Sequence, residues 1–221
     1  MQSETQYTIY FAGDLFDHKH LAGNALLAEA IREGSNGRFQ SRLPQSFEHA
    51  YTRGVDIRNM DLKAVMACDL ALFNFDGPDI DSGTVVEFMF AKMLDIPSVI
   101  FRSDFRGTSD SQREDWNLMA THYPRTEVVQ AHSLGIYREL NEQFDSTEAL
   151  LSTYYKRLAE PIVAAFERVV AERPLPMTTP HFAEQLYHWA TQFPASSFAE
   201  HCGVDFVEQV LAQKRAKGLL G

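Results

Sequence analysis

The chain has 221 residues, 45% of them hydrophobic, which is enough for one globular core with a helical appendage. Its formal charge of -10 and pI near 5.2 argue against nucleic-acid polymers and anionic membrane surfaces as partners. No apolar run is long enough to cross a bilayer, and the N-terminus MQSETQYT lacks the charge pattern of a signal peptide. Two distant cysteines, Cys68 and Cys202, indicate a reducing cytoplasm, with Cys68 buried in an apolar context.

Strands and helices alternate from the N-terminus. The first predicted helix begins after the cap Asp17 and ends at Gly34, the second covers Ile57–Cys68 after the cap Asp56, and the third begins near Gly83 after the cap Ser82. This alternation predicts an α/β fold with a parallel sheet. The predicted strands are 7–12, 38–43, 70–75, 97–101 and 127–131.

The C-terminal part of the sequence has a helical pattern. It runs from Ser146 to Val169, and Pro161 is expected to kink or split this helix. A connector at 173–176 precedes two amphipathic segments, which we expect to pack on the domain or on a sister subunit. We therefore predict an α/β domain over 1–172, with a five-stranded sheet and helices on both faces, and a helical extension over 173–221.

The stretch Asp69–Leu94 is typical of a strand, an acidic loop and a helix N-terminus, the usual ligand position in an open α/β sheet. Gly83 allows a ligand to approach the backbone. Glu87 has no basic neighbour three or four positions away on this helix. Such a carboxylate is costly unless it faces a polar cavity, although a helix dipole also favours a glutamate near the N-terminus. Both interpretations stay open.

The loop after the first strand carries Asp14, Asp17, His18 and His20. Their spacing matches no strong metal-ligand motif, so a solvated loop with a helix cap is favoured over a metal site. The sequence also lacks a Walker lysine after a glycine loop, GxGxxG, GxSxG and CxxC. We accordingly predict no cofactor and no metal.

The remaining chemistry lies in the carboxylates Asp61, Asp81 and Glu87. Paired carboxylates suit glycosyl chemistry, because one can attack or stabilise the anomeric carbon while another handles protons on the leaving group. For Asp61 a structural alternative is a surface ion pair with Arg58, three residues earlier, which would contribute little.

Three segments together resemble the nucleoside 2-deoxyribosyltransferase family. They are TIYFAGDLF at the first strand, MDLKAVMACDLALFNFDGPDIDSGTVVEFMFA in the centre, and WNLM at 116–119. The central segment places Asp81, Gly83 and Glu87 at the family's spacing. The order and approximate separation of the segments agree with the family, and the resemblance covers residues 7–170.

The resemblance implies a flavodoxin-like fold and homo-oligomers, a dimer or a dimer-based hexamer, with shared active sites. It implies Glu87 as the nucleophile on C1′ of a 2′-deoxyribosyl group, Asp61 and Asp81 beside the base, and Tyr10 orienting Glu87. The ligands would be a deoxynucleoside and a free nucleobase, as in base salvage. The implied substrate-binding residues are Gly13, Gln45, Ser82, Gly83, Met119 and Asn117, the last reaching the 5′-hydroxyl from a neighbouring subunit.

Two departures from the family pattern bear on function. Residues 174–221 extend beyond the family core. The loop 13–16 carries Asp14 and no basic residue, which argues against a 5′-phosphate unless Arg102 and Arg106 fold back. Three functions stay open: a deoxyribosyltransferase or its hydrolytic sibling, an N-glycosidase of 5′-monophosphates, and a non-catalytic nucleoside or nucleotide sensor. The intact carboxylate set favours catalysis.

Overall fold

The computed structural model describes residues 5–47, 54–104, 117–176, 179 and 181–220. One five-stranded parallel sheet forms its centre, in the order β2-β1-β3-β4-β5. The predicted fold class is confirmed, and every strand end lies within one residue of its predicted position. The strands are β1 (Tyr7–Ala12), β2 (Phe39–Arg42), β3 (Leu70–Asn74), β4 (Ser98–Arg102) and β5 (Thr126–Gln130).

The chain direction across the sheet reverses between β1 and β3. From β1 the chain moves outward to β2 and then returns to β3 on the other side, with Ile9 opposite Leu70 and Ala12 opposite Phe73. The loops after β1 and β3 therefore lead away from each other at the carboxyl ends of two neighbouring strands. This strand order is that of flavodoxin-like folds, in which ligands bind at this reversal.

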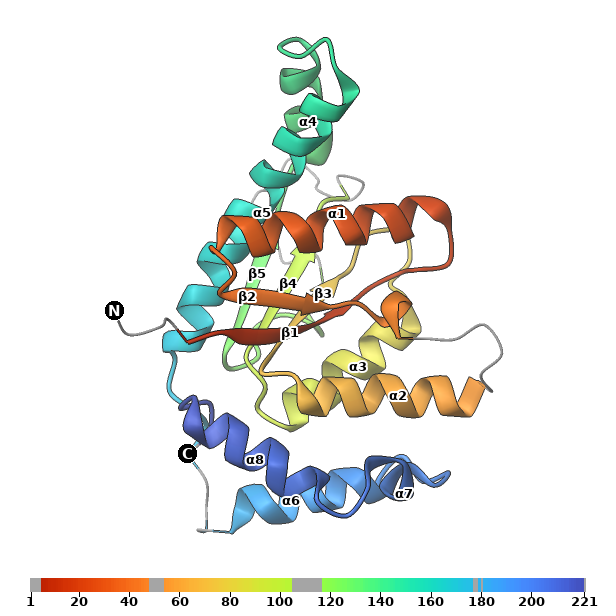
Figure 1. Cartoon of the computed structure of the whole chain (residues 1–221), viewed down its shortest axis with the longest axis vertical. Coiled ribbons are helices and arrows are strands. Elements are labelled where there is room, and N and C mark those ends of the chain that lie inside the picture. The colour runs from red at the N-terminus through yellow and green to blue at the C-terminus, as the bar shows by residue number, and fades with distance from the viewer. Residues whose placement is uncertain (1–4, 48–53, 105–116, 177–178, 180, 221) are drawn as a thin grey trace.

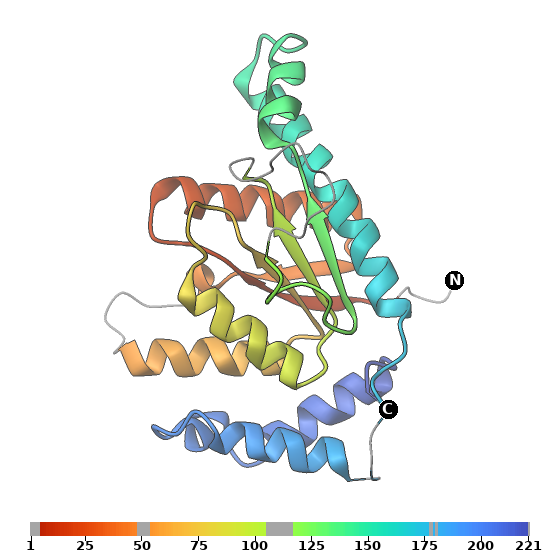
Figure 2. The same cartoon turned by 180° about the vertical axis from the view of Figure 1, so that it is seen from behind.

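Helices cover both faces of the sheet, and a further helical layer lies beyond one face. Figure 1 shows α1 and α5 on one side, α2 and α3 on the other, and α6 to α8 outside α2 and α3; α4 and the start of α5 project from the body (Figures 1 and 2). The helices are α1 (His18–Gly34), η1 (Pro44–Ser46), α2 (Gly54–Ala67), α3 (Ser82–Met93), α4 (Ser133–Asn141), α5 (Thr147–Ala171), α6 (Phe182–Gln192), α7 (Phe198–Cys202) and α8 (Phe206–Ala216).

The alternation of side chains along the strands produces two apolar cores. In β1, Ile9 and Phe11 face α1 and α5, whereas Tyr10 and Ala12 face α2 and α3. Each of these side chains is at most 1% exposed, because the strand has helices on both sides. Tyr10 thus brings a hydroxyl group into the core that contains α3.

Helix starts were predicted with mixed success. Asp17 caps α1 as predicted, accepting from the backbone N–H groups of Lys19 at 2.8 Å and His20 at 3.1 Å. The cap predicted at Asp56 is wrong, since α2 already runs from Gly54 and Asp56 lies in its first turn. The cap predicted at Ser82 is also wrong: Ser82 is helical, and the extended Asp81 accepts from the N–H of Thr84.

The predicted split at Pro161 does not occur. Helix α5 continues through this residue from Thr147 to Ala171. Pro161 lies on the exposed side, and so does Arg157, whose carbonyl would otherwise accept its missing N–H. Water can bond to that carbonyl, so the helix tolerates the proline. The short helices α4 and α7 had no counterpart in the predicted elements.

The C-terminal extension packs on the domain within the same chain. Its side chains Ala183, Tyr187 and Phe198 are at most 2% exposed and share a core with α2 and α3. At the amino end of β3, Asp69 accepts from Gln213 Nε2 at 2.8 Å and Lys217 Nζ at 2.7 Å. Burial opposes ionisation of Asp69, but hydrogen bonds from Lys217 and Thr8 outweigh it and lower its pKa.

A buried ion pair joins both ends of the extension to the domain. Arg125 NH1 donates to Asp95 Oδ2 at 2.8 Å and to the carbonyl of Leu219 at 3.0 Å. Asp95 Oδ2 also accepts from the backbone N–H of Leu175 at 2.9 Å. Since Arg125 and Asp95 are nearly inaccessible to water, each depends on the other for compensation of its charge.

Two further observations concern the whole chain. Among the described residues, no helix combines the length and apolar composition needed to cross a membrane. Both cysteines are buried free thiols, so the predicted burial of Cys68 is confirmed. Burial raises the pKa of the Cys68 thiol to about 11, which makes it a poor nucleophile at neutral pH.

Replacing Arg125 tests this ion pair. We expect Arg125→Ala to lower the free energy of unfolding by about 3–5 kcal/mol, because Asp95 stays buried without its cation. Urea unfolding measures the change. The control is Arg168→Ala, which removes a more exposed pair with Glu127 and should cost less than about 1 kcal/mol. Equal losses in the two variants would contradict the assignment.

Candidate active site

The carboxylate of Glu87 is held by a hydroxyl from the sheet. Glu87 lies in the second turn of α3 and is half-buried, and the fully buried Tyr10 of β1 donates from its hydroxyl to Glu87 Oε1 at 2.6 Å. A short bond to a carboxylate is a strong one and fixes the orientation of the acceptor. The carboxylate is therefore oriented at the reversal between β1 and β3.

Asp61 of α2 belongs to the same electrostatic cluster. Burial raises the pKa of Tyr10 well above its ordinary value, and the negative charges of Glu87 and Asp61 raise it further. The hydroxyl of Tyr10 thus keeps its proton at neutral pH and remains a donor. Three predicted catalytic residues, Tyr10, Asp61 and Glu87, come together from β1, α2 and α3.

The N-terminus of α3 is closed by Asp81. Its Oδ2 accepts from the backbone N–H of Thr84 at 2.7 Å and from the Thr84 hydroxyl at 2.8 Å. A Cβ at Gly83 would lie 3.1 Å from this oxygen, so the glycine leaves room for the cap. Ser82 and Gly83 are exposed in the first turn, a little more than one turn before Glu87. Asp81 therefore caps α3, whatever its part in the chemistry.

The loop between β3 and α3 is tied to the end of β4. Asp76 accepts from the Ser103 hydroxyl at 2.7 Å and from the N–H of Asp104 at 2.8 Å, while Asp104 accepts from the N–H of Gly77 at 3.1 Å. Arg102 donates to the carbonyls of Phe75 and Gly77. Sequence reasoning missed Asp76 as a loop anchor. Since Ser103 and Asp104 are 27 and 28 residues away, no local pattern marks it.

The loop after β1 lies close against the end of β3. A Cβ at Gly13 would be 3.0 Å from the Asn74 Cβ, so only glycine allows this approach without displacement. The next residue, Asp14, has a raised pKa because of burial and the nearby charge of Asp81. His20 Nδ1 lies 3.1 Å from an Asp17 oxygen, and His20 Nε2 lies 3.9 Å from an Asp14 oxygen. These three residues, which the sequence analysis considered as metal ligands, therefore interact with one another.

Three predicted substrate-binding residues have other contacts. Gln45 Nε2 donates to the carbonyl of Leu21 at 2.9 Å, on α1. Asn117 Oδ1 accepts from the N–H of Met119 at 2.9 Å, which closes a turn whose Met119 side chain is 80% exposed. Arg106, raised above as a possible phosphate contact, lies outside the described residues. The structure thus gathers Tyr10, Asp61 and Glu87, places Asp81 at the cap of the helix that carries Glu87, and gives Gln45 and Asn117 hydrogen bonds to other groups.

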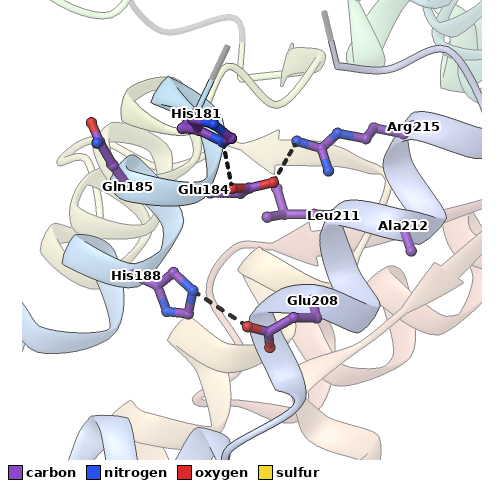
Figure 3. Close-up of a pocket in the computed structure, with 8 residues that line it drawn as sticks. All are labelled: His181, Glu184, Gln185, His188, Glu208, Leu211, Ala212 and Arg215. Atoms are coloured by element: carbon purple, nitrogen blue, oxygen red, sulfur yellow. Dashed lines mark hydrogen bonds and ion pairs between the residues drawn. The ribbon is translucent and has the colours of Figure 1, made fainter. Parts of the chain in front are cut away.

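A separate cavity of about 610 Å³ lies between α6 and α8 (Figure 3). Its charged side chains pair with each other: Glu184 lies 3.2 Å from His181 and 3.3 Å from Arg215, and His188 lies 3.4 Å from Glu208. These groups are exposed and belong to the extension alone. We therefore place the candidate active site at Glu87 and not in this cavity.

Comparison with known proteins decides the family. The sequence profile of the nucleoside 2-deoxyribosyltransferases matches residues 9–119, half of the chain. The chain belongs to this family. It is thereby assigned to a class of pentosyltransferase enzymes, and the matched segment contains Tyr10, Asp61, Asp81 and Glu87. A search of curated proteins found no significant match.

Solved structures with a similar fold include a conserved protein from Enterococcus faecalis V583. That structure has a TM-score of 0.50 and 28% identity, and the alignment covers 70% of this chain and 100% of that one. A 2-deoxyribosyltransferase from Bacillus psychrosaccharolyticus has a TM-score of 0.39, 19% identity and coverage of 52% and 91%. A 2-desoxiribosyltransferase from Leishmania mexicana has a TM-score of 0.43, 21% identity and coverage of 68% and 97%. Part of this chain thus has no counterpart in the Enterococcus protein.

The capping role of Asp81 can be measured apart from any chemistry. We expect Asp81→Ala to lower the free energy of unfolding by about 1 kcal/mol, because the N–H of Thr84 loses its acceptor. Asp81→Asn keeps an acceptor oxygen and should stay within a few tenths of a kcal/mol of the unmodified protein. Thermal unfolding measures both variants. A loss in Asp81→Asn as large as in Asp81→Ala would contradict the capping role.

Proposed function

We propose that this protein is a nucleoside 2-deoxyribosyltransferase that acts through a covalent glutamyl-deoxyribose intermediate. It cleaves the N-glycosidic bond of a 2′-deoxynucleoside and transfers the sugar to a second base. The observation that carries the proposal is the 2.6 Å hydrogen bond from buried Tyr10 to Glu87, at the strand reversal of a chain in this family. Family membership supplies the reaction class, and this bond supplies an oriented carboxylate.

In the first step, an oxygen of Glu87 attacks C1′ of the deoxyribosyl group. The C1′–N bond breaks, its electron pair moves to the departing base, and a glutamyl ester forms. The sugar lacks a 2′-hydroxyl, so positive charge develops on its ring more easily in the transition state. Tyr10 holds the attacking carboxylate in place and, as a donor, disperses its charge.

The departing base needs a proton, which we assign to the pair Asp61 and Asp81. Asp81 Oδ2 is committed to the cap of α3, which leaves Oδ1 to contact a base. Asp61 lies near enough to Tyr10 for its charge to act on the hydroxyl that holds Glu87. We accordingly assign the proton transfer to Asp61, which shares the surroundings of Glu87, and the contact with base N–H groups to Asp81.

In the second step, a nitrogen of the incoming base attacks C1′ and displaces Glu87. Two displacements at one carbon retain its configuration. Water in place of the base would give free deoxyribose, which is the hydrolytic alternative on the same residues. A pocket that holds a base and excludes water favours transfer.

We propose nucleosides rather than 5′-monophosphates as substrates. Arg102 donates to the carbonyls of Phe75 and Gly77, so its guanidinium holds the loop after β3 in place. The loop after β1 offers Asp14, a carboxyl group that would repel a phosphate. Ser82, Gly83 and Gly13 are proposed to border the substrate at the two loops, and Gln45 to contact the base.

We further propose a homo-oligomer with shared sites, a dimer or a dimer-based hexamer, in which Asn117 of one subunit binds the 5′-hydroxyl in the next. Apolar side chains are exposed on α3 (Val86 at 58% and Met89 at 43%) and on the turn beside it (Leu118 at 75% and Met119 at 80%). Tyr123 joins the two, since its hydroxyl lies 3.5 Å from Met89 Sδ. Exposed large apolar side chains that gather on one surface are typical of a subunit contact, and we propose that these four belong to it.

The proposal also includes the division of the chain into domains, the metabolic role and the cellular compartment. We treat residues 1–172 as the catalytic domain and 173–221 as an extension that packs on it. The reaction exchanges bases between deoxynucleosides, which suits salvage, and the buried free thiols suit the cytoplasm.

Mass spectrometry of the protein mixed with a 2′-deoxynucleoside tests the proposal. We expect an adduct of one deoxyribosyl group on Glu87, and base exchange when a second free base is added. Glu87→Ala should abolish the adduct and lower turnover at least about 10³-fold, since it removes the nucleophile. Free deoxyribose without exchange would establish the hydrolase, and faster turnover of 5′-monophosphates would overturn the substrate assignment. Binding of the deoxynucleoside without turnover would support the alternative function of a non-catalytic sensor.

Tyr10→Phe serves as the matched variant in this experiment. It removes one hydrogen bond to a carboxylate, worth about 1.5–3 kcal/mol, and should slow turnover about 10- to 100-fold while the adduct still forms. An unchanged rate would show that Tyr10 does not position Glu87.

Mixing two inactive variants tests whether the sites are shared. Glu87→Ala and Asn117→Ala each damage one partner of the same site. If Asn117 acts across the interface, mixed dimers contain one intact site, and an equal mixture should recover about a quarter of the full activity. Sedimentation of each variant confirms assembly. No recovery from assembled, exchanging subunits would place Asn117 in the site of its own chain.

A further inference from the structure

The loop between β1 and α1 is bound by a buried side chain of α1. Asn24 Nδ2 donates to the carbonyl of Asp14 at 2.9 Å, ten residues earlier in the chain. The adjacent Gly13 lies so close to Asn74 at the end of β3 that a Cβ would come 3.0 Å from the Asn74 Cβ. At its far end the loop is closed by the Asp17 cap. The path of the loop is therefore fixed by contacts with β3 and with α1.

Asn24 is a polar residue in the apolar row of α1. It is 6% exposed and precedes the buried Leu27 and Ile31 by three and seven residues, a spacing that places the three side chains on one face of the helix. A buried amide is costly unless it is hydrogen-bonded, whereas an apolar residue would pack here without that requirement. The contact with the loop therefore explains an asparagine at this position.

Helix α1 is itself firmly packed. At Gly23 it approaches α5 so closely that a Cβ would lie 3.3 Å from the Tyr155 hydroxyl. Leu27 and Ile31 are at most 3% exposed in the core that α1 shares with α5. Since the helix cannot shift without disturbing this packing, Asn24 gives the Asp14 carbonyl a fixed position.

The residue that Asn24 holds has a side chain among the acids at the carboxyl end of the sheet. Burial and the charge of Asp81 raise the pKa of Asp14, His20 lowers it from 3.9 Å, and Asp17 raises it slightly. Asp81 in turn caps the helix that carries Glu87. The position of the Asp14 carboxyl group relative to Asp81 depends on the loop backbone, and the loop backbone depends on Asn24.

We propose that Asn24 is a positioning residue for the substrate site: by holding the Asp14 carbonyl it fixes residues 13 and 14 as one wall of the site and keeps the Asp14 carboxyl group near Asp81, where it disfavours a phosphate. The proposal rests on the proposed function for the identity of the substrate. Asn24 is buried in the core under α1, so it acts through the loop and not by contact with the substrate.

Steady-state kinetics with thymidine and 2′-deoxyadenosine as deoxyribosyl donors test the proposal. We expect Asn24→Ala to raise KM about tenfold, because a released loop must be ordered when the substrate binds. It should leave kcat within about twofold, because Tyr10 and Glu87 lie on other elements. An unchanged KM, or a fall in kcat at unchanged KM, would overturn the role of Asn24.

Competition by the 5′-monophosphates of the same nucleosides tests the position of the charge. We expect Asn24→Ala to reduce the preference for the nucleoside about tenfold, since Asp14 is then free to turn away from the site. Asp14→Asn should reduce it as much, and the double variant no more than either single one, because Asn24 acts through Asp14. Additive losses in the double variant would show that the two residues act independently, against the proposal.

Ser35→Ala is the matched control. Ser35 caps the other end of α1 and is 8% exposed, and its hydroxyl accepts from the N–H of Phe39 at 3.1 Å and donates to the carbonyl of Arg32 at 3.2 Å. This variant also removes a buried hydrogen-bonding side chain from α1, so it should lower stability without changing KM. A rise in KM equal to that in Asn24→Ala would assign the effect to loosened packing and reject the positioning.

Carboxyl-carbon NMR gives a readout that does not need activity. In Asn24→Ala the labelled Asp14 carboxyl group should titrate at a lower pH than in the unmodified protein, because a released Asp14 is less buried and farther from Asp81. In Ser35→Ala its titration should not change. A lowered Asp14 pKa in a protein without deoxyribosyl transfer would support the positioning and reject the proposed function. Transfer with an unshifted Asp14 would reject the positioning and keep the function.

Discussion

The hydrogen bond between Tyr10 and Glu87 connects the sheet to helix α3. It requires a tyrosine at an inward position of β1, and the alternation of side chains along that strand supplies it. It also requires that α3 begin at the residue that brings Glu87 opposite the Tyr10 hydroxyl. Asp81 fixes that start, and Asp76 and Arg102 tie the intervening loop to the end of β4. The position of one carboxylate thus depends on three strands and a cap.

The extension changes the surroundings of the helices that carry the acids. In a three-layer α/β sandwich, α2 and α3 would expose their outer faces. Here α6 to α8 cover them (Figure 2), and buried polar contacts at Asp69, Arg125 and Asn59 fix the cover at separate points. A helix packed on two sides has less freedom to tilt. This rigidity suits the proposed reaction, in which carboxyl groups on α2 and α3 act on one bond.

Sequence reasoning predicted the sheet almost to the residue, because buried parallel strands form continuous apolar runs between polar loops. It also singled out Glu87, since a carboxylate without basic neighbours on an apolar helix is a local signal. It placed the cap of α3 wrongly, because the neighbouring residues Asp81 and Ser82 both have side chains that suit an N-cap. The backbone conformation shows that Asp81 is the cap. Asn59 gave no signal, because its partner Ser196 is 137 residues away. The roles of Tyr10 and Asn117 came from the family resemblance alone.

The electrostatics of the loops bear on the proposal of a substrate without a phosphate. The loops at the carboxyl ends of β1 and β3 carry Asp14, Asp76 and Asp81, and burial together with the nearby charge of Asp81 raises the pKa of Asp14. A substrate with a phosphate would add negative charge to this cluster, at a cost that grows as water is excluded. A nucleoside adds none, and its base offers N–H groups to the acids. The same crowding that disfavours a phosphate raises the pKa of Asp14, because burial and the charge of Asp81 both oppose its ionisation.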